Sequence, residues 1–444
     1  MRDSAMSSDL LARDSRVIWH PFTQALTAPE PIAAVSASGA EIVDADGNVI
    51  LDMISSWWVN LHGHSHPRIA EAIAAQAKTM EQVIFATCTH EPAVSLAEGI
   101  VGLLPAPLSR VFYSDNGSTA VEVALKMALQ FFRNRGETKR TRFVAMDGAY
   151  HGDTVGAMSL GVSCGIFDVW GEMLFAVDTL PNAPTWDGDD DVDAKEAKAL
   201  AALDDYLAAN GDAVVAAVVE PLVQGAGGMR MCRPEFLKAW VEKLKAAGAL
   251  IVFDEVMTGF GRLGEAFACL KTGVSPDFVC LSKGITGGFM PMAATVTTDA
   301  VYAAFLARDT AKAFLHGHSY TANPLGCAAG NASLALLRDP ACAKRRAEIE
   351  AFHRAALAEV RKLPGVRKPR VTGTIAALTL DPGGAERGLG AAVGLKLKEF
   401  FKAENMLIRP LGNVVYLLPP YCVTDDQLAR AWDSIARGIR AVSA

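Results

Sequence analysis

The sequence predicts an α/β protein with a mostly parallel central sheet, helices on both faces, and a smaller α+β domain after it. Residues 249–253 and 278–281 are short, apolar and partly β-branched runs, as in parallel strands buried on both faces. A third such run, 214–219, precedes an amphipathic helix at 234–247, and Gly248 ends that helix before the next strand. This strand–helix–strand repetition favours a doubly wound sheet.

The other elements follow from local patterns. Residues 44–48 are turn-forming and lie between two apolar runs, so they predict a hairpin. Residues 1–15 are polar, and we expect a frayed end. Residues 187–193 are acidic and are expected to form a solvated loop. Apolar periodicity predicts helices at 68–80, 92–104, 120–133, 325–337, 345–362, 391–403 and 425–442, and strands beginning at 111 and spanning 142–146, 371–380 and 414–417.

These elements suggest three parts of the chain. Residues 66–330 would form the large α/β domain, and residues 331–444 the small α+β domain. Residues 1–65 are expected to pack with the small domain.

Composition narrows the class of protein. The chain has 444 residues, of which 51% are apolar, so we expect more than one core and some surface buried between subunits. Apolar runs fall short of the ~18 residues that cross a bilayer. The net charge of −7, with mixed signs, disfavours nucleic acid and anionic membranes as partners. The eight cysteines form no C-x-x-C pair, which favours a reducing, cytoplasmic location.

Charged residues follow the two central strands. Asp254 and Glu255 come at the end of the first, and Lys283, followed by the glycine-rich segment 284–288, comes after the second. Open α/β sheets bind ligands at this edge. A lysine beside apolar strand ends loses hydration, which lowers its pKa and suits it to bond covalently with an aldehyde. Taken alone, the pattern is equally typical of a metal ligand, a helix cap or a plain turn.

Two further strand ends add to this pattern. Gly117 and Ser118 begin a predicted helix, where free backbone N–H groups, a hydroxyl and the positive end of the helix dipole suit a phosphate. An ordinary helix cap is the alternative. Tyr150 follows strand 142–146 at the same edge. An anion site, an aromatic ring, an acid and an amine together are what pyridoxal phosphate requires, with the acid keeping the pyridine nitrogen protonated.

One loop carries two adjacent tryptophans and three alternate histidines. Trp57 and Trp58 cannot both face one core, so at least one is expected to face a ligand or a partner chain, with plain packing as the alternative. His62, His64 and His66 have no acidic or cysteine ligand close in sequence. We therefore do not expect a metal site there.

Two motifs then identify a family. D-E-V-M-T-G-F-G-R at 254–262 and S-K-G-I-T-G-G at 282–288 resemble the class III aminotransferases of pyridoxal-phosphate fold type I. The resemblance extends over about residues 16–436. It implies a pyridoxal-phosphate-dependent aminotransferase of fold type I, active as a homodimer with its active sites at the subunit interface.

The resemblance also assigns roles to residues of the cofactor site. Lys283 would bond to the cofactor aldehyde, and Asp254 would pair with the pyridinium nitrogen. Val256 and Tyr150 would cover opposite faces of the ring. The phosphate is expected to contact four residues, the last two from the other subunit: Gly117, Ser118, His318 and Ser319. The family more often has proline and threonine at these last two positions.

A substrate site beside the cofactor is implied as well. Arg409 matches the arginine that binds the substrate carboxylate, a task that suits a bidentate guanidinium. Trp57 and Trp58 would line the path of the apolar chain. Further contacts are expected from Phe22, Tyr150, Gly317 and Tyr416, the last with plain core packing as the alternative. Arg262 is expected in a structural ion pair, with substrate contact as the alternative. Glu220 resembles an acid that pairs with an arginine.

Five segments, at 16–24, 55–67, 149–154, 220–229 and 408–421, resemble one branch of the class, and the first two select it. That branch converts 8-amino-7-oxononanoate to 7,8-diaminononanoate in biotin biosynthesis, with S-adenosylmethionine as amino donor. Phe22 stands where the branch has a tyrosine, so lysine or another amine is an alternative donor. The rival functions are those of an ω-amino acid–pyruvate transaminase, of a mutase or decarboxylase using the same cofactor, and of a non-catalytic cofactor-binding protein.

Overall fold

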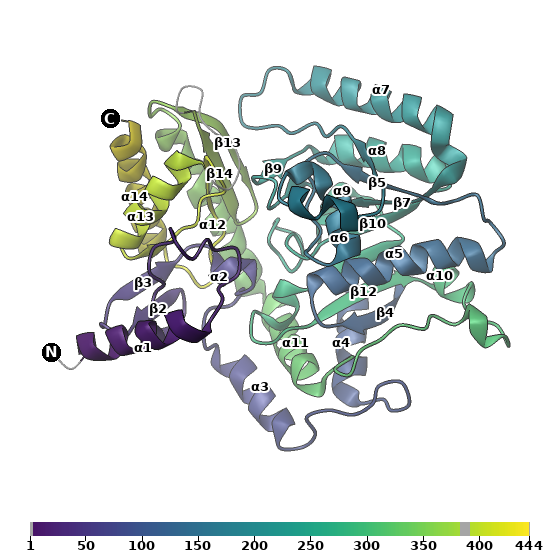
Figure 1. The fold of residues 1–444 in the computed structure, drawn as a ribbon, viewed down its shortest axis with the longest axis horizontal. Helices are drawn as coiled ribbons and strands as arrows, with labels where there is room; N and C mark the ends of the chain where they lie inside the picture. The colour runs from purple at the N-terminus through teal and green to yellow at the C-terminus, as the bar shows by residue number, and fades with distance from the viewer. Residues whose placement is uncertain (1–2, 382–390, 444) are drawn as a thin grey trace.

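The computed structural model describes residues 3–381 and 391–443, and a seven-stranded sheet forms the centre of its larger part (Figure 1). The strand order is β4-β12-β11-β10-β7-β5-β6. Neighbouring strands run parallel, except that β12 is antiparallel to β11 and β4. The strands are β4 (Leu108–Ser114), β5 (Arg142–Met146), β6 (Asp178–Leu180), β7 (Val214–Val219), β10 (Leu250–Asp254), β11 (Phe278–Leu281) and β12 (Ala293–Thr298). The mostly parallel sheet of the prediction is confirmed.

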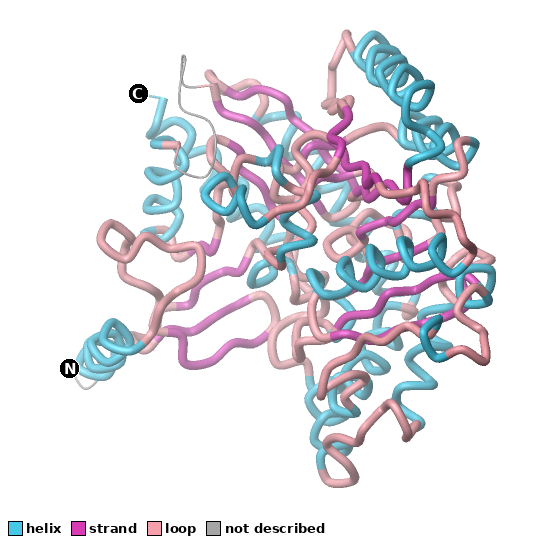
Figure 2. Tube along the Cα trace, turned by 45° about the vertical axis from the view of Figure 1, so that its right-hand side comes forward, coloured by secondary structure: helices cyan, strands magenta, loops and turns pink. Residues whose placement is uncertain are grey.

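Both faces of this sheet are buried, which explains why its strands are continuously apolar. Along β10, Leu250 and Val252 pack into a core with α5 (Gly117–Asn134), whereas Ile251 and Phe253 face the opposite core. Figure 2 shows the magenta strands among the cyan helices. The second core is covered by α4 (Glu91–Val101), α7 (Val192–Asn210), α8 (Pro234–Ala246), α9 (Ala268–Thr272) and α11 (Pro324–Leu337).

The two ends of the chain share a separate core, on the left of Figure 1. β3 (Val49–Asp52) pairs in parallel with β15 (Met406–Leu407), which completes the sheet β1-β2-β3-β15. Leu51 and Met53 pack in one cluster with residues from three C-terminal helices. The remaining elements of this part are β1 (Ala34–Ser38), β2 (Glu41–Asp44), β13 (Val366–Thr372), β14 (Ile375–Leu380), β16 (Val414–Leu417), α12 (Pro340–Val360), α13 (Ala392–Ala403) and α14 (Asp425–Ser443). The division of the chain into domains stays a prediction.

Two local predictions are wrong. Residues 3–15 are not frayed, because α1 covers Asp3–Val17 and carries an Asp9–Arg13 pair one turn apart. Residues 1 and 2 lie outside the described residues. The single strand expected at 371–380 is the hairpin β13–β14. Gly373, at φ +54°, makes this turn, and a β-carbon there would lie 2.3 Å from the backbone oxygen of Arg262. An apolar run alone does not reveal such a turn.

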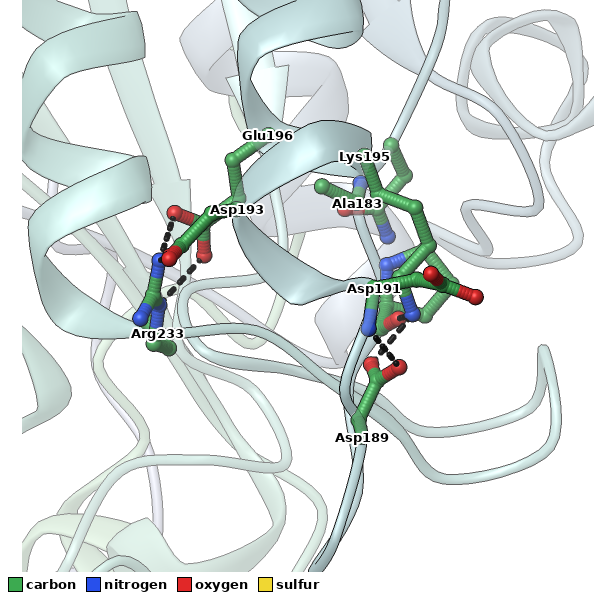
Figure 3. Close-up of polar contacts among 9 residues, drawn as sticks. Ala183, Asp189, Asp191, Asp193, Lys195, Glu196 and Arg233 are labelled. Carbon is green, nitrogen blue, oxygen red and sulfur yellow. Dashed lines mark hydrogen bonds and ion pairs between the residues drawn. The ribbon is translucent and has the colours of Figure 1, made fainter.

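Ion pairs fix the start of α7 to its surroundings (Figure 3). Arg233 makes a bidentate contact with Glu196, at 2.7 and 2.5 Å, and reaches Asp193 at 2.5 Å. Asp189 pairs with Lys195, whose ammonium also lies 4.0 Å from the ring centroid of Trp186. The acidic stretch predicted as a solvated loop is therefore partly tied down by ion pairs.

Other helices are α2 (Ser55–Trp58), α3 (Pro67–Ala77), α6 (Val155–Leu160) and α10 (Asp299–Ala303). In the part of the chain that the structure describes, no helix combines the length and apolarity needed to cross a membrane. All eight cysteines are free thiols.

Replacing Gly394 by alanine should destabilise the fold. A β-carbon on this α13 residue would lie 2.1 Å from the backbone oxygen of Gly412, and neither backbone can move away without shifting its element. We expect a loss of about 1–3 kcal/mol in the free energy of unfolding, measured by thermal denaturation at fixed cofactor concentration. Gly171→Ala is the control, because nothing lies within 4 Å of the point that a β-carbon would occupy there. Equal melting temperatures for the two variants would contradict the steric argument.

Candidate active site

A cavity of about 450 Å³ lies at the carboxyl edge of the large sheet. β10 ends at Asp254 and β11 leads to Lys283, and because the two strands are parallel neighbours, both side chains reach this edge. Seven of the predicted site residues line the cavity: Trp58, Gly117, Ser118, Tyr150, Asp254, Val256 and Lys283.

Asp254 is held by two hydrogen bonds. One carboxylate oxygen accepts from the backbone N–H of Val256 at 3.1 Å, and the other from Nδ1 of His151 at 2.7 Å. Because a carboxylate only accepts, Nδ1 of His151 carries the proton. Both side chains are almost fully buried, and Nε2 of His151 has no hydrogen-bond partner among the described residues. His151 was missed in the sequence, where its position beside Tyr150 was the available signal.

Lys283 stands in partly desolvated surroundings beside Trp58. Its Nζ lies 4.9 Å from the centroid of the Trp58 ring. Burial lowers the pKa of Lys283, Asp254 and Glu220 raise it, and the positive charge of Arg262 lowers it further. The net shift is downward, so the amine is more readily neutral than a lysine in water. A neutral amine can attack an aldehyde or accept a proton.

The N-terminus of α5 points into the same cavity. Asn116 caps the helix by accepting from the N–H of Thr119 at 3.0 Å, while the N–H groups of Gly117 and Ser118 have no partner within the helix. A β-carbon on Gly117 would lie 2.6 Å from Cγ1 of Val256, so glycine permits the close approach of these two segments. The hydroxyl oxygen of Ser118 accepts from the N–H of Asp153 at 3.0 Å and keeps its own proton to donate. This geometry suits an anion.

Tyr150 and Glu220 form the next part of the wall. The hydroxyl of Tyr150 donates to Asp153 at 3.0 Å, and its ring stacks on Phe167 with centroids 5.9 Å apart. Glu220 accepts from the backbone N–H groups of Tyr150, at 3.0 Å, and Gly225, at 2.8 Å. Burial raises the pKa of Glu220 to about 7. Its partners here are backbone groups rather than the arginine that the sequence suggested.

The side chains of Trp57 and Trp58 lie in different surroundings, as the sequence predicted. Trp58 is buried and donates from Nε1 to the hydroxyl of Tyr416 at 3.0 Å, which places Tyr416 in the core behind the cavity. Trp57 is 39% exposed. The guanidinium of Arg409 lies 4.5 Å from the Trp57 ring centroid, and Phe22 meets the same ring edge-on at 5.5 Å. Phe22, Trp57 and Arg409 thus form a second cluster, joined to the cavity through Trp58.

Arg262 is buried without the expected ion pair. It donates to the backbone oxygens of Trp58 at 3.4 Å, Asn60 at 3.1 Å and Pro419 at 2.7 Å. Its guanidinium also lies 5.1 Å from the ring centroid of Tyr421. No ion pair of Arg262 occurs among the residues that the structure describes, where its Nη1 and Nη2 donate to backbone oxygens, so the prediction of a structural ion pair is wrong. Main-chain oxygens take the place of the carboxylate.

Gly317, His318 and Ser319 do not line the cavity of their own chain. They lie on the loop before α11, where the backbone oxygen of Ser319 accepts from Gln82 at 2.6 Å and the N–H of His318 donates to Thr321 at 3.2 Å. Their contact with the site of another subunit stays a prediction.

The three histidines have separate surroundings. Nε2 of His62 lies 3.2 Å from the Ser333 hydroxyl, and burial lowers the pKa of His62 to about 3. His64 contacts Asp52 at 3.0 Å. Burial and the neighbouring Arg68 lower the pKa of His66. Within residues 3–381 and 391–443, no group of three or more His, Cys, Asp or Glu residues is arranged to hold a metal ion.

Comparison with known proteins decides the family. The aminotransferase class-III family profile matches residues 24–439. The chain belongs to the class III aminotransferases. The "adenosylmethionine-8-amino-7-oxononanoate aminotransferase" of Synechococcus elongatus is 52% identical over 421 residues, which cover 94% of this chain and 97% of that protein. The protein of the same name from Geobacter sulfurreducens is 38% identical, with 97% of each chain covered.

Solved structures agree with this class III assignment. The adenosylmethionine-8-amino-7-oxononanoate aminotransferase of Methanocaldococcus jannaschii has a TM-score of 0.89 at 30% identity, covering 98% of this chain and 99% of that chain. An amine transaminase from an uncultivated Pseudomonas species, solved in its pyridoxal-phosphate-bound form, has a TM-score of 0.87 at 28% identity, covering 96% and 98%. The predicted family, its aminotransferase activity and fold type I are confirmed.

The buried carboxyl of Glu220 should make stability depend on pH. Because its pKa is raised from about 4.5 to about 7, the folded protein keeps a proton that the unfolded chain has already lost. Stability from this group therefore falls as pH rises between those values. Glu220→Gln lacks this titration. We expect the free energy of unfolding of the variant, relative to that of the parent, to increase by on the order of 3 kcal/mol between pH 5 and pH 8. Denaturant unfolding of both proteins across this range measures it. A difference independent of pH would contradict the raised pKa.

Proposed function

We propose that the protein transfers an amino group to 8-amino-7-oxononanoate, forming 7,8-diaminononanoate for biotin biosynthesis, with pyridoxal phosphate as cofactor. The observation that carries the chemistry is that Lys283, Asp254 and the N-terminus of α5 face one cavity. The substrate comes from the printed names of the relatives, which match nearly the whole chain.

The residues present fit this cofactor. Asp254 lines the cavity as a hydrogen-bond acceptor for a pyridinium N–H, and Lys283 offers an amine for the aldehyde. Gly117 and Ser118 offer free N–H groups and a hydroxyl for the phosphate. Tyr150 and Val256 would lie on the two faces of the ring, because both line the cavity and come from different segments of the chain, Val256 two residues after Asp254. When bound, pyridoxal phosphate withdraws electrons from the carbon that bears the amino group.

The chain supplies the proton transfers. A lysine whose pKa is lowered is free to accept a proton from the amino-bearing carbon and then to return it to the cofactor side, as general base and general acid. Trp58 covers one side of the Lys283 amine and limits its contact with water. His151 donates a hydrogen bond to the carboxylate of Asp254 and so fixes its position. The amino group leaves a donor in the first half of the reaction and reaches the acceptor in the second, a ping-pong order.

The second cluster suits the acceptor. The guanidinium of Arg409 can bind its carboxylate in bidentate fashion, and the Trp57 ring, with Phe22 at its edge, offers an apolar surface for the chain. We further propose a homodimer in which Gly317, His318 and Ser319 complete the site of the other subunit. S-adenosylmethionine is the proposed amino donor, because the relatives' names include it. A cytoplasmic location stays a prediction.

Lys283→Ala should abolish activity and covalent attachment of the cofactor. We expect the parent protein, reconstituted with pyridoxal phosphate, to be yellow and to bleach with borohydride, and the variant to remain colourless after desalting. The enzyme loaded with pyridoxamine phosphate should convert 8-amino-7-oxononanoate in a single turnover, with the variant slower by about 10³-fold or more. Lys271→Ala, on α9, is the control. If the parent protein turns over ω-amino acids and pyruvate but not this acceptor, the substrate assignment fails.

Phe22→Tyr should change the choice of amino donor. The added hydroxyl introduces a hydrogen-bonding group at the edge of the Trp57 ring, where Phe22 offers an apolar surface. We expect the ratio of kcat/KM for S-adenosylmethionine to that for lysine to change by about tenfold, in line with one hydrogen bond in a binding site. Unchanged ratios in steady-state assays with both donors would remove Phe22 from donor selection.

A further inference from the structure

The tryptophan pair sits on an unusual backbone. Ser55, Ser56, Trp57 and Trp58 have positive φ angles of 52°, 44°, 72° and 75°. The N–H of Trp58 donates to the oxygen of Ile54 at 2.8 Å, and the N–H of Val59 to that of Ser55 at 3.0 Å. The segment, labelled α2, is therefore one turn of left-handed helix. Residues with a β-carbon disfavour this conformation, because the β-carbon comes too close to the following carbonyl oxygen.

Nothing in the sequence of this turn favours the left-handed form, since it contains neither glycine nor asparagine. Four such residues in a row persist when their surroundings over-determine them. Asp52, whose side chain is fully buried, is the first of the residues that hold the turn.

Asp52 bridges three points around the turn. One carboxylate oxygen accepts from the N–H of Ile54 at 3.2 Å, just before the turn. The other accepts from the hydroxyl of Ser56 at 2.8 Å, inside the turn, and lies 3.0 Å from Nε2 of His64, in the loop that follows. The carboxylate thus ties the start, the middle and the exit of this segment to one point.

Contacts from the rest of the chain hold the other positions. The hydroxyl of Ser55 donates to the backbone oxygen of Leu418 at 2.7 Å. Arg262 donates to the backbone oxygen of Trp58, and the Trp58 indole donates to Tyr416. Ser56 is the turn residue whose side chain is tied to Asp52 rather than to the C-terminal part of the chain.

The turn sends the two indoles in different directions. The indole of Trp58 lies at the cavity, with its ring centroid 4.9 Å from Nζ of Lys283. The indole of Trp57 lies against Arg409, with its ring centroid 4.5 Å from the guanidinium carbon. If the turn relaxed to a right-handed or extended backbone, both directions would change. The surface offered to an apolar acceptor therefore depends on keeping this backbone conformation.

We propose that Asp52, acting through Ser56, is a positioning residue that determines acceptor selection by holding the left-handed turn that places Trp57 against Arg409. The identity of the acceptor rests on the function proposed above. The position of the turn does not depend on it. Asp52 acts through the backbone it holds and is not expected to touch substrate or cofactor.

The test compares alanine and glycine at position 56. Ser56→Ala removes the hydroxyl and keeps the β-carbon that disfavours the turn, whereas Ser56→Gly removes both, and glycine adopts positive φ readily. We expect Ser56→Ala to raise KM for 8-amino-7-oxononanoate about tenfold with kcat within about twofold of the parent. Ser56→Gly should keep KM within about threefold and should unfold at a higher temperature than Ser56→Ala.

Ser95 provides a matched control. Its hydroxyl donates to the carboxylate of Glu91, four residues earlier, at 2.7 Å, as that of Ser56 does to Asp52, but it lies on the right-handed helix α4. There alanine should be more stable than glycine, because glycine weakens a right-handed helix. The proposal requires the opposite order of unfolding temperatures at the two positions. The same order at both positions overturns it.

A double-mutant cycle tests the link between the two residues. Asp52→Ala removes both acceptor oxygens, so it should raise KM at least as much as Ser56→Ala does. The double variant should be no worse than Asp52→Ala alone. Additive effects on KM would show that Asp52 does not act through Ser56. If the parent protein shows no activity with this acceptor, the proposed function fails, and the same double-mutant cycle, measured as unfolding temperatures, still decides whether Asp52 acts through Ser56.

Discussion

The parallel pairing of β10 with β11 is the constraint on which the site depends. Asp254 stands opposite Cys280 in this pairing, so the residues just past Cys280 reach the cavity that Asp254 lines. Both charged groups are shielded from water there, and different contacts replace their lost hydration. Asp254 accepts from His151 and from the N–H of Val256, whereas the amine of Lys283 faces an aromatic ring. The acid is stabilised as a fixed acceptor, and the amine is left ready to lose its proton.

Much of this could be predicted because parallel strands place their carboxyl ends along one edge. Asp254, Lys283, Tyr150 and the start of α5 each follow a recognisable strand, and all of them line one cavity. The role of His151 depends on a contact between residues 103 positions apart, which a local pattern cannot reveal. The hairpin at Gly373 and the left-handed turn at 55–58 were missed for a related reason. Tertiary contacts impose both on sequences whose local preferences point elsewhere.

The residues proposed for catalysis and those proposed for substrate selection come from different parts of the chain. Lys283 and Asp254 come from the ends of strands in the large sheet, which is buried on both faces. Trp57 and Arg409 come from the segments where the N-terminal and C-terminal parts share one core. Loops carried on a fixed scaffold can change their side chains without disturbing the strands beneath them. Under the proposed roles, substitutions in the second cluster change which acceptor binds and leave the positions of Lys283 and Asp254 unchanged.

Arg262 connects these two parts. Its guanidinium donates to the backbone oxygens of Trp58 and Asn60 and so fixes the end of the left-handed turn at 55–58. The same positive charge contributes to the lowered pKa of Lys283. A carboxylate partner would cancel that charge, whereas the main-chain oxygens that accept from Nη1 and Nη2 leave it in place. The absence of an ion pair among the described partners of Arg262 is therefore consistent with a double role. In the proposed mechanism, one buried cation fixes the backbone of the tryptophan turn and, at the same time, favours the neutral form of Lys283.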